Sequence, residues 1–394
     1  MDIFKVINLI KRLVEENFNE IVKIRRHLHK YPELSFHEHK TSAYIKSILT
    51  KWDIPFTDGI AETGVVVVLK GKNPDIKTVA LRADFDALPI QEETDLAYGS
   101  VNQGVMHACG HDAHTASMLG ALKVLHYLQL EWEGSIKFIF QPAEEQLPGG
   151  AQQMIKEGVL KSPNVETIIG QHVFPDMEVG KVGFRVGKYM ASTDEVHIVV
   201  KGKGGHAALP QQYNNPLIVG ARLILELDSF FNQYKDAPSV FAIGFIEGAG
   251  STNVIPDRVS LKGTLRVMDE DLRKEFHSQL LAISEGISKE YNMVIDFDIR
   301  KGYPCLINDK KITEESISFA KKYLGEENVI ELPVRMTAED FSYYSQIIPS
   351  CFYRLGVRNE VKGIINGLHT SKFNIDEESL KIGMGLMAYL AIKN

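Results

Sequence analysis

The stretch MHACGHDAH at residues 106–114 places one thiol, three imidazoles and one carboxylate within a single short segment. Cys109 and His111 are suitable ligands for zinc or a similar first-row metal, and Gly110 between them lets a loop turn both side chains toward one point. A single Cys or His is more often packed or solvated than bound to a metal. The stretch therefore predicts part of a metal site that needs further ligands from distant segments.

Length and composition narrow the class of protein. The 394 residues exceed the size at which one hydrophobic core stops growing, so we expect two domains, and 44% hydrophobic with 24% charged residues is typical of a soluble globular protein. A net charge of −7 without dense basic runs argues against a nucleic-acid partner. Three cysteines are too few for a disulfide framework and favour the cytoplasm. Residues 1–20 mix apolar and charged side chains at helical spacing, unlike a signal peptide, and we expect no membrane span.

Several potential ligands follow predicted strands. Apolar runs bounded by turn residues predict strands at 63–70, 77–84, 134–141 and 166–171. Asp84 ends the second of these strands, Glu144 and Glu145 follow the third, and His172 follows the fourth. In open α/β sheets, ligands bind beyond the carboxyl ends of the strands. The alternation of strands and helices thus predicts a largely parallel sheet flanked by helices, with a site at this edge.

Two helices of this part of the chain bear on the site. One begins near the N-terminus and continues to His29, and another follows the MHACGHDAH stretch to about residue 129, capped by Asp112 or Thr115. Because alternate positions on a helix point to different faces, His27 and His29 cannot both reach one metal, and we expect them at the surface.

The character of the sequence changes between residues 186 and 301. Strands with alternating polar and apolar residues accompany helices near 215–231 and 270–291, which predicts a small α+β domain with one exposed sheet face. It is inserted into a catalytic domain made of residues 1–185 and 302–394. Within the insertion, the glycine-rich loop at 202–210 fits no phosphate-binding pattern, so His206 lies either in a mobile functional loop or in a plain hairpin turn.

The candidate ligands suit a pair of divalent metals about 3.5 Å apart, which can share a bridging hydroxide. The soft, borderline and hard donors of such a centre are Cys109, His111, Glu145, His172 and His369. Neighbouring side chains of an extended segment point to opposite sides, so Glu144 can stay off the metals and act as a general base. The alternative for Glu144 and Glu145 is a solvated acidic pair.

Six motifs occur in one order along the chain: HACGHD (107–112), QPAEE (141–145), QHV (171–173), GHA (205–207), NVIPD (253–257) and LHT (368–370). Together they resemble the metal-dependent amidohydrolases that include hippurate hydrolase, indole-acetyl-amino-acid hydrolases and N-acyl-amino-acid aminoacylase/carboxypeptidases. The resemblance implies a dimetal peptidase-type α/β catalytic domain with an inserted α+β lid that commonly forms the dimer.

The resemblance also implies roles for individual residues. The five residues above match metal ligands, and Glu144 matches the general base. His206 matches a residue that steadies the oxyanion, often in the site of a neighbouring subunit, while Asn253 and Arg266 match positions that contact the scissile carbonyl or the substrate carboxylate. Asp84 matches an acid that orients a ligand histidine. Arg82 stands where the wider superfamily has a histidine, and Gln171 where many relatives have a smaller or apolar residue.

The expected function is hydrolysis of the amide bond of an N-acyl amino acid or short peptide by a metal-bound hydroxide, with Glu144 as base. The expected cofactors are two divalent ions, either zinc, manganese, cobalt or nickel. The alternatives are a carboxypeptidase, a dedicated deacetylase of a biosynthetic intermediate, or a non-catalytic metal- or ligand-binding protein. The expected partners are the small substrate and further copies of the chain, joined through the lid in a homodimer or higher oligomer, without nucleic acid or membrane.

Overall fold

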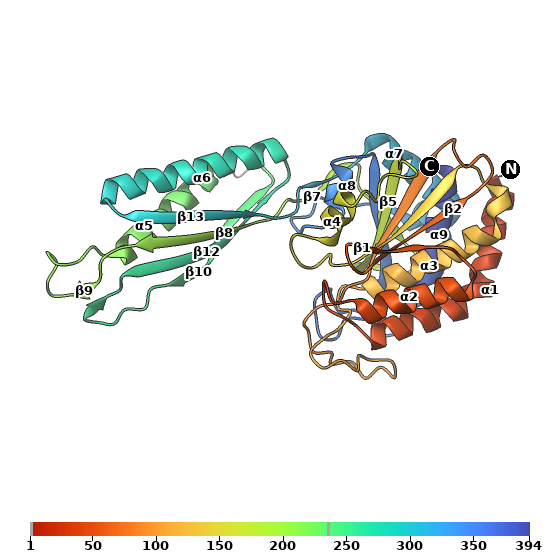
Figure 1. Cartoon of the computed structure of the whole chain (residues 1–394), viewed down its shortest axis with the longest axis horizontal. Coiled ribbons are helices and arrows are strands. Elements are labelled where there is room, and N and C mark those ends of the chain that lie inside the picture. The colour runs from red at the N-terminus through yellow and green to blue at the C-terminus, as the bar shows by residue number, and fades with distance from the viewer. Residues whose placement is uncertain (1–2, 235–236) are drawn as a thin grey trace. The chain divides into compact units, whose positions relative to one another are not determined.

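A computed structural model of the chain describes residues 3–234 and 237–394. Met1 and Asp2, which the expected first helix included, lie outside the described residues. The chain divides into two compact units (Figure 1). The first unit comprises Met1–Gly187, Ile307–Pro333 and Asp340–Asn394, and the second comprises Lys188–Leu306 and Val334–Glu339.

The first unit is built on an eight-stranded sheet with the order β1-β2-β4-β3-β5-β16-β6-β15. These strands are β1 (Thr57–Ile60), β2 (Gly64–Lys70), β3 (Thr78–Asp84), β4 (Ser135–Gln141), β5 (Thr167–Glu178), β6 (Val182–Phe184), β15 (Val329–Glu331) and β16 (Ser350–Arg358). Strands β4, β3, β5 and β16 run parallel, whereas β2 runs antiparallel to β4. All residues of β3 and β4 are buried, which explains their apolar runs without alternation. The predicted mixed, largely parallel sheet is confirmed.

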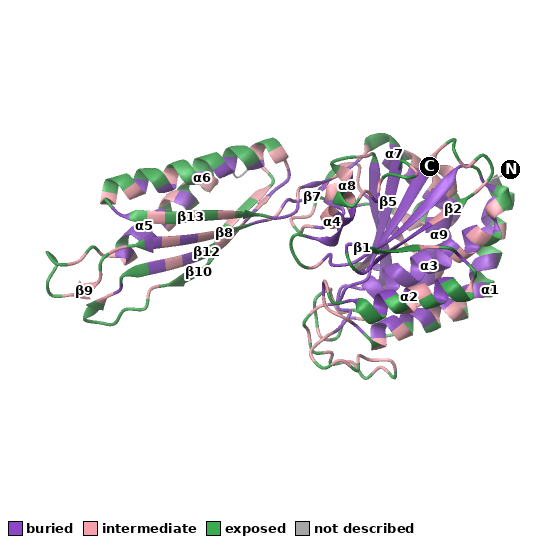
Figure 2. Cartoon of the chain, in the orientation of Figure 1, coloured by how far each residue is buried: buried purple, intermediate pink, exposed green. Residues whose placement is uncertain are grey.

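Helices cover this sheet. They are α1 (Ile3–Lys30), α2 (His39–Lys51), α3 (His111–Tyr127), α4 (Gly150–Lys156), α7 (Lys310–Leu324), α8 (Ser342–Ser345) and α9 (Ser379–Lys393). Helices α1, α3 and α9 pack against one another, and Figure 2 shows α3 buried along almost its whole length. A Cβ atom at Gly120 of α3 would lie 2.7 Å from Sδ of Met384, so glycine permits the close approach of α3 to α9. Among the described residues, no helix has both the length and the apolar character needed to cross a membrane.

Three local expectations were wrong. Gly110 is the N-cap of α3 and makes no side-chain capping bond, so neither Asp112 nor Thr115 caps this helix. His29 is buried rather than exposed, because its Nδ1 lies 2.7 Å from Oδ2 of Asp112. Strand β5 continues to Glu178, so His172 lies within the strand and not after it.

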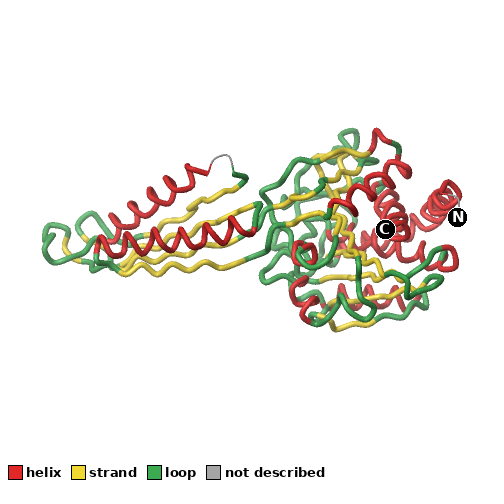
Figure 3. The backbone as a smooth tube through the Cα atoms, turned by 90° about the horizontal axis from the view of Figure 1, so that it is seen from above, coloured by secondary structure: helices red, strands yellow, loops and turns green. Residues whose placement is uncertain are grey.

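The second unit contains a four-stranded antiparallel sheet with the order β10-β12-β8-β13. Its elements are β8 (Asp194–Lys201), β9 (Gly205–His206), α5 (Pro216–Phe231), β10 (Ser239–Glu247), β11 (Val254–Ile255), β12 (Arg258–Val267), α6 (Glu270–Tyr291) and β13 (Val294–Lys301). Figure 3 shows both helices running along these strands. Alternate residues of β8 are buried in the core of this unit, as the sequence pattern predicts. The short strands β7 (Gly187–Met190) and β14 (Leu306–Asn308) lie where the chain passes between the units.

A buried ionic cluster attaches α6 to the sheet of the second unit. Asp194 accepts hydrogen bonds from Nε of Arg273 at 2.9 Å and from Nε2 of His277 at 2.6 Å. Arg273 also donates to the carbonyl oxygens of Thr193 and Gly302, at 3.3 and 3.2 Å. Burial disfavours the ionised carboxylate, but Arg273 and His277 outweigh burial and lower the pKa of Asp194 to about 2. The cluster therefore joins the helix to the segments by which the chain enters and leaves this unit.

We predict that Asp194→Ala lowers the free energy of unfolding by about 3–5 kcal/mol, because the buried Arg273 guanidinium loses its counter-charge. The exposed pair between Arg222 and Glu226 provides the control, and Arg222→Ala should cost less than about 0.5 kcal/mol. Urea denaturation followed by circular dichroism measures both. Equal shifts in the two variants would show that the cluster contributes no more than a surface ion pair.

Candidate metal centre

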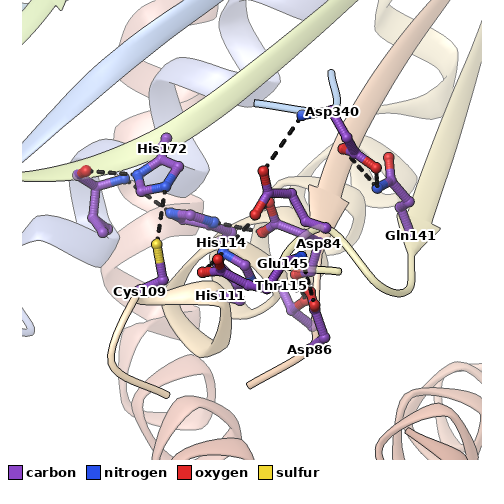
Figure 4. Close-up of polar contacts among 12 residues, drawn as sticks. Asp84, Asp86, Cys109, His111, His114, Thr115, Gln141, Glu145, His172 and Asp340 are labelled. Carbon is purple, nitrogen blue, oxygen red and sulfur yellow. Dashed lines mark hydrogen bonds and ion pairs between the residues drawn. The ribbon is translucent and has the colours of Figure 1, made fainter. Parts of the chain in front are cut away.

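The structure brings all five predicted ligands together in the first unit. Cys109 precedes α3 and His111 begins it, Glu145 follows β4, His172 lies in β5, and His369 lies in the loop before α9. Sγ of Cys109 is 3.5 Å from Nε2 of His172 and 3.3 Å from Nε2 of His369. Oε1 of Glu145 lies 3.2 Å from Nε2 of His369 and 3.8 Å from Nε2 of His111. Figure 4 shows four of these residues, Cys109, His111, Glu145 and His172, which come from three segments of the chain.

The potential ligand atoms form overlapping groups. Those of Cys109, His111 and His172 lie within 4.8 Å of one another, and so do those of Cys109, Glu145 and His369. Cys109 belongs to both groups. One soft sulfur, three imidazole nitrogens and one carboxylate form a donor set that suits borderline divalent cations such as zinc.

Two of the imidazoles turn Nδ1 toward an oxygen acceptor and so leave Nε2 for a metal. Nδ1 of His172 lies 2.7 Å from the carbonyl oxygen of Val173, which can only accept, so Nδ1 carries the proton and Nε2 presents its lone pair toward Cys109. Nδ1 of His111 likewise faces Oδ1 of Asp86 at 3.1 Å. Nε2 of His111 and Oε1 of Glu145 are buried without a hydrogen bond among the described residues. The side chains therefore fit a bound cation.

The electrostatics of the site also favour positive charge. Burial disfavours the charged form of His111, but Asp84, Asp86 and Glu145 outweigh burial and raise its pKa to about 10. Burial, together with the negative charge of Glu145, raises the pKa of the Cys109 thiol well above its usual value. A divalent cation reverses the effect on the thiol, because a coordinated thiol loses its proton.

Backbone geometry explains the glycine between the first two ligands. Gly110 has φ of +82°, and a Cβ atom there would lie 2.5 Å from Cγ2 of Val173. Only glycine accommodates both the left-handed turn and this contact. His369 also lies in the left-handed region, with φ of +59°, and its N–H donates to the carbonyl oxygen of Ala108 at 2.8 Å. That bond holds the last ligand against the loop that carries Cys109.

Glu144 and Glu145 are not a solvated acidic pair. Glu144 is buried, and its Oε1 accepts a hydrogen bond of 3.4 Å from the N–H of Asp340. Its carboxylate lies within 4.8 Å of the ligand atoms of His111 and Glu145. Glu144 thus lies beside two of the predicted metal ligands.

Asp84 and Asp86 have different partners. Asp84 lies 2.6 Å from Nδ1 of His114, whose Nε2 accepts from the N–H of Val173 at 2.9 Å. Both nitrogens of His114 are therefore engaged in hydrogen bonds. The other oxygen of Asp84 accepts from Arg82 at 2.6 Å.

Asp86 is the carboxylate that faces Nδ1 of the predicted ligand His111, whereas the family resemblance implied an orienting role for Asp84. Oδ2 of Asp86 also accepts from the N–H of Glu145 at 3.0 Å and from Oγ of Ser35 at 2.6 Å. The sequence signal for Asp86 was its position directly beyond β3.

The remaining predicted residues belong to the second unit. His206 is exposed in β9, and Asn253 lies beside it, because the carbonyl oxygen of Asn253 accepts from the N–H of Ala207 at 3.0 Å. Arg266 lies near the other end of β12, about 26 Å along the strand from Arg258 at roughly 3.3 Å per residue. Burial lowers the pKa of Arg266. The structure thus groups His206 with Asn253 and separates both from Arg266.

Comparison with known proteins agrees with this site. N-acetyl-L-cysteine deacetylase of Bacillus subtilis is 37% identical over 92% of this chain and 85% of its own length. Thermostable carboxypeptidase 1 of Saccharolobus solfataricus is 36% identical over 98% of both chains. The crystal structure of Bacillus subtilis YXEP, a dinuclear metal-binding peptidase, matches with a TM-score of 0.83 and 34% identity, covering 96% of this chain and 98% of that one.

Fold, site and relatives together define a metal-dependent hydrolase that cleaves amide bonds. The chain belongs to peptidase family M20/M25/M40, whose family model matches residues 80–393.

We predict that Asp86→Ala lowers the affinity for the metal about 10- to 100-fold, since the variant loses the acceptor for His111 and for the backbone of Glu145. Titration of chelator-treated protein with zinc, followed by calorimetry, measures the affinity. The exposed Asp58, which pairs with Lys46, supplies the control Asp58→Ala, with unchanged affinity. An Asp86→Ala variant that binds zinc as tightly as this control would contradict the prediction.

Proposed function

We propose that this enzyme hydrolyses the amide bond of N-acyl amino acids or short peptides with a free carboxylate, using two divalent metal ions. Zinc, manganese, cobalt and nickel all suit the mixed donor set. The observation that carries the proposal is the buried Glu144 carboxylate beside the convergent ligands. One relative is named as a deacetylase of N-acetyl-L-cysteine, which is a small N-acyl amino acid, and this name supports the proposed substrate class. Another is described as a dinuclear metal-binding peptidase, which supports the proposed pair of metal ions.

Each proposed role follows from side-chain chemistry. The metals would be held by Cys109, His111, Glu145, His172 and His369. When bound, they supply Lewis acidity toward water and the scissile carbonyl. Glu144 takes the proton of the attacking water and delivers it to the leaving amine. His206 and Asn253 donate to the developing oxyanion, and the Arg266 guanidinium binds the substrate carboxylate.

We further propose a homodimer or a higher homo-oligomer formed through the second unit. His206 pairs with Val254 in β11, which directly precedes the start of β12. Arg266 lies roughly 26 Å from that start, a distance that a small N-acyl amino acid cannot span. His206 and Asn253 therefore act on the substrate of a second copy. Strand β10 lies at one edge of the sheet, and its Phe245 and Ile246 are exposed. An unpaired apolar edge strand favours pairing with a strand of another chain.

Two narrower activities have support from particular relatives, whose names describe a deacetylase and a carboxypeptidase. A panel of N-acyl amino acids and dipeptides, assayed with each of the four metals, separates them from a general aminoacylase. A non-catalytic binding protein is disfavoured because all five ligand residues are present. We place the enzyme in the cytoplasm, in keeping with three free and buried cysteines.

We predict that Glu144→Gln lowers kcat at least about 100-fold while the metal content stays unchanged, because the amide cannot accept the proton of water. Steady-state assays on an N-acetyl amino acid and elemental analysis provide the two measurements. The exposed Glu131 gives the control variant Glu131→Gln, which should retain the activity of the parent enzyme. Full activity of Glu144→Gln would rule out its role as base.

A mixing experiment tests the oligomer. His206→Ala and Glu144→Ala should each be inactive alone, whereas dimers re-formed from an equal mixture should recover about a quarter of the parent activity, since half are mixed and each mixed dimer has one intact site. Re-forming each variant with itself controls for handling. If the mixture is no more active than the two variants re-formed separately, the result would contradict a site shared between subunits.

A further inference from the structure

The backbone that carries Glu144 and Glu145 has an unusual conformation. Ala143 has φ of +53°, in the left-handed region that is costly for a residue with a Cβ atom. The carbonyl oxygen of Ala143 accepts from the N–H of Gly150 at 2.8 Å. Such a conformation persists only where surrounding groups hold it. The direction of both glutamates depends on those groups.

Two buried carboxylates hold this segment by its N–H groups. Asp86 accepts from the N–H of Glu145, as described above. Oε1 of Glu38 accepts from the N–H of Ala143 at 2.9 Å and from that of Phe36 at 2.9 Å, while Oε2 accepts from Oγ of Thr63 at 3.1 Å. Glu38 lies far from Ala143 in the sequence, directly before α2, and is fully buried.

The local structure around Glu38 does not account for a buried carboxylate. Glu38 is the N-cap residue of α2, but its side chain makes no capping hydrogen bond. The groups that donate to it among the described residues, the N–H groups of Phe36 and Ala143 and the hydroxyl of Thr63, carry no charge, and a buried carboxylate without a counter-charge is costly. Burial and the nearby Asp86 raise its pKa to about 7. Hydrogen bonds from backbone N–H groups, that of Ala143 among them, offset part of this cost.

We propose that Glu38 is a positioning residue for hydrolysis: its side-chain oxygen fixes the left-handed backbone of Ala143 and thereby aims the Glu144 carboxylate at the attacking water. The hydrogen-bond partners of Glu38 among the described residues, Phe36, Thr63 and Ala143, include none of the predicted metal ligands. This inference rests on the proposed role of Glu144 as the general base.

Two variants of nearly equal length separate this role from a merely structural one. Glu38→Gln keeps an oxygen that accepts from Ala143 and Phe36, and its amide N–H can donate to Thr63. Glu38→Met fills the same space without accepting a hydrogen bond. The buried Leu49 of α2, which is not among the predicted site residues, supplies the stability control Leu49→Ala, which creates a cavity in the hydrophobic core.

Assays on a chromogenic N-acyl amino acid at saturating metal give kcat and KM per folded chain, and elemental analysis gives the metal content. Glu38→Met should lower kcat on the order of 10- to 100-fold with KM within about twofold and unchanged metal content. Glu38→Gln should retain kcat within about threefold, since it keeps the acceptor. Leu49→Ala should lower the denaturation midpoint and leave kcat unchanged.

The inference is overturned if Glu38→Met matches Leu49→Ala in kcat, or if Glu38→Gln is as impaired as Glu38→Met. If Glu38→Met does not fold, Glu38→Asp replaces it, because the shorter side chain withdraws the acceptor and should also lower kcat. An active Glu144→Gln would refute the proposed function itself. An inactive Glu144→Gln with a fully active Glu38→Met would refute only the positioning role.

Discussion

The hydrogen bonds of the Asp86 carboxylate are the interaction on which the metal centre depends. One oxygen faces Nδ1 of His111, and the other accepts from Ser35 and from the N–H of Glu145. A predicted ligand at the start of α3 and another after β4 are thereby fixed to the segment that directly follows β3. Because Asp86 is fully buried, loss of one partner leaves a charge or a polar group without solvation. The carboxyl edge of the sheet therefore determines where the ligands lie.

Charge balance is the second constraint on the same region. Two of its buried acids have permanent cationic partners, since Asp84 pairs with Arg82, and Asp112 pairs with Arg25 at 2.8 Å. For Asp86 the partner is His111, whose raised pKa reflects the surrounding acids. A cation bound at Nε2 of His111 would supply the positive charge that the acids favour while leaving the bond to Asp86 in place. Orientation of the ligand and electrostatic compensation thus come from one arrangement.

Sequence patterns predicted the features that depend on residue type and periodicity. The buried runs of β3 and β4 predicted the sheet, and the chemistry of Cys109 and His111 predicted a shared site. The patterns did not distinguish Asp84 from Asp86, because both lie where β3 ends and only the three-dimensional packing selects their partners. The burial of His29 was missed for a related reason: helical periodicity records apolar faces, whereas His29 is buried through its bond to the distant Asp112.

Arg82 in β3 occupies the position at which the wider superfamily has a histidine, and here it binds buried acids instead. Its guanidinium donates to Asp84 at 2.6 Å and to Gln141 at 2.8 Å, and it pairs with Asp340 at 2.5 Å. The backbone N–H of Asp340 in turn donates to Glu144. A guanidinium stays charged at any physiological pH and keeps its planar set of donors. Arg82 therefore supports the carboxylate of the predicted base through Asp340, while the predicted metal ligands Cys109 and His111 lie on another segment.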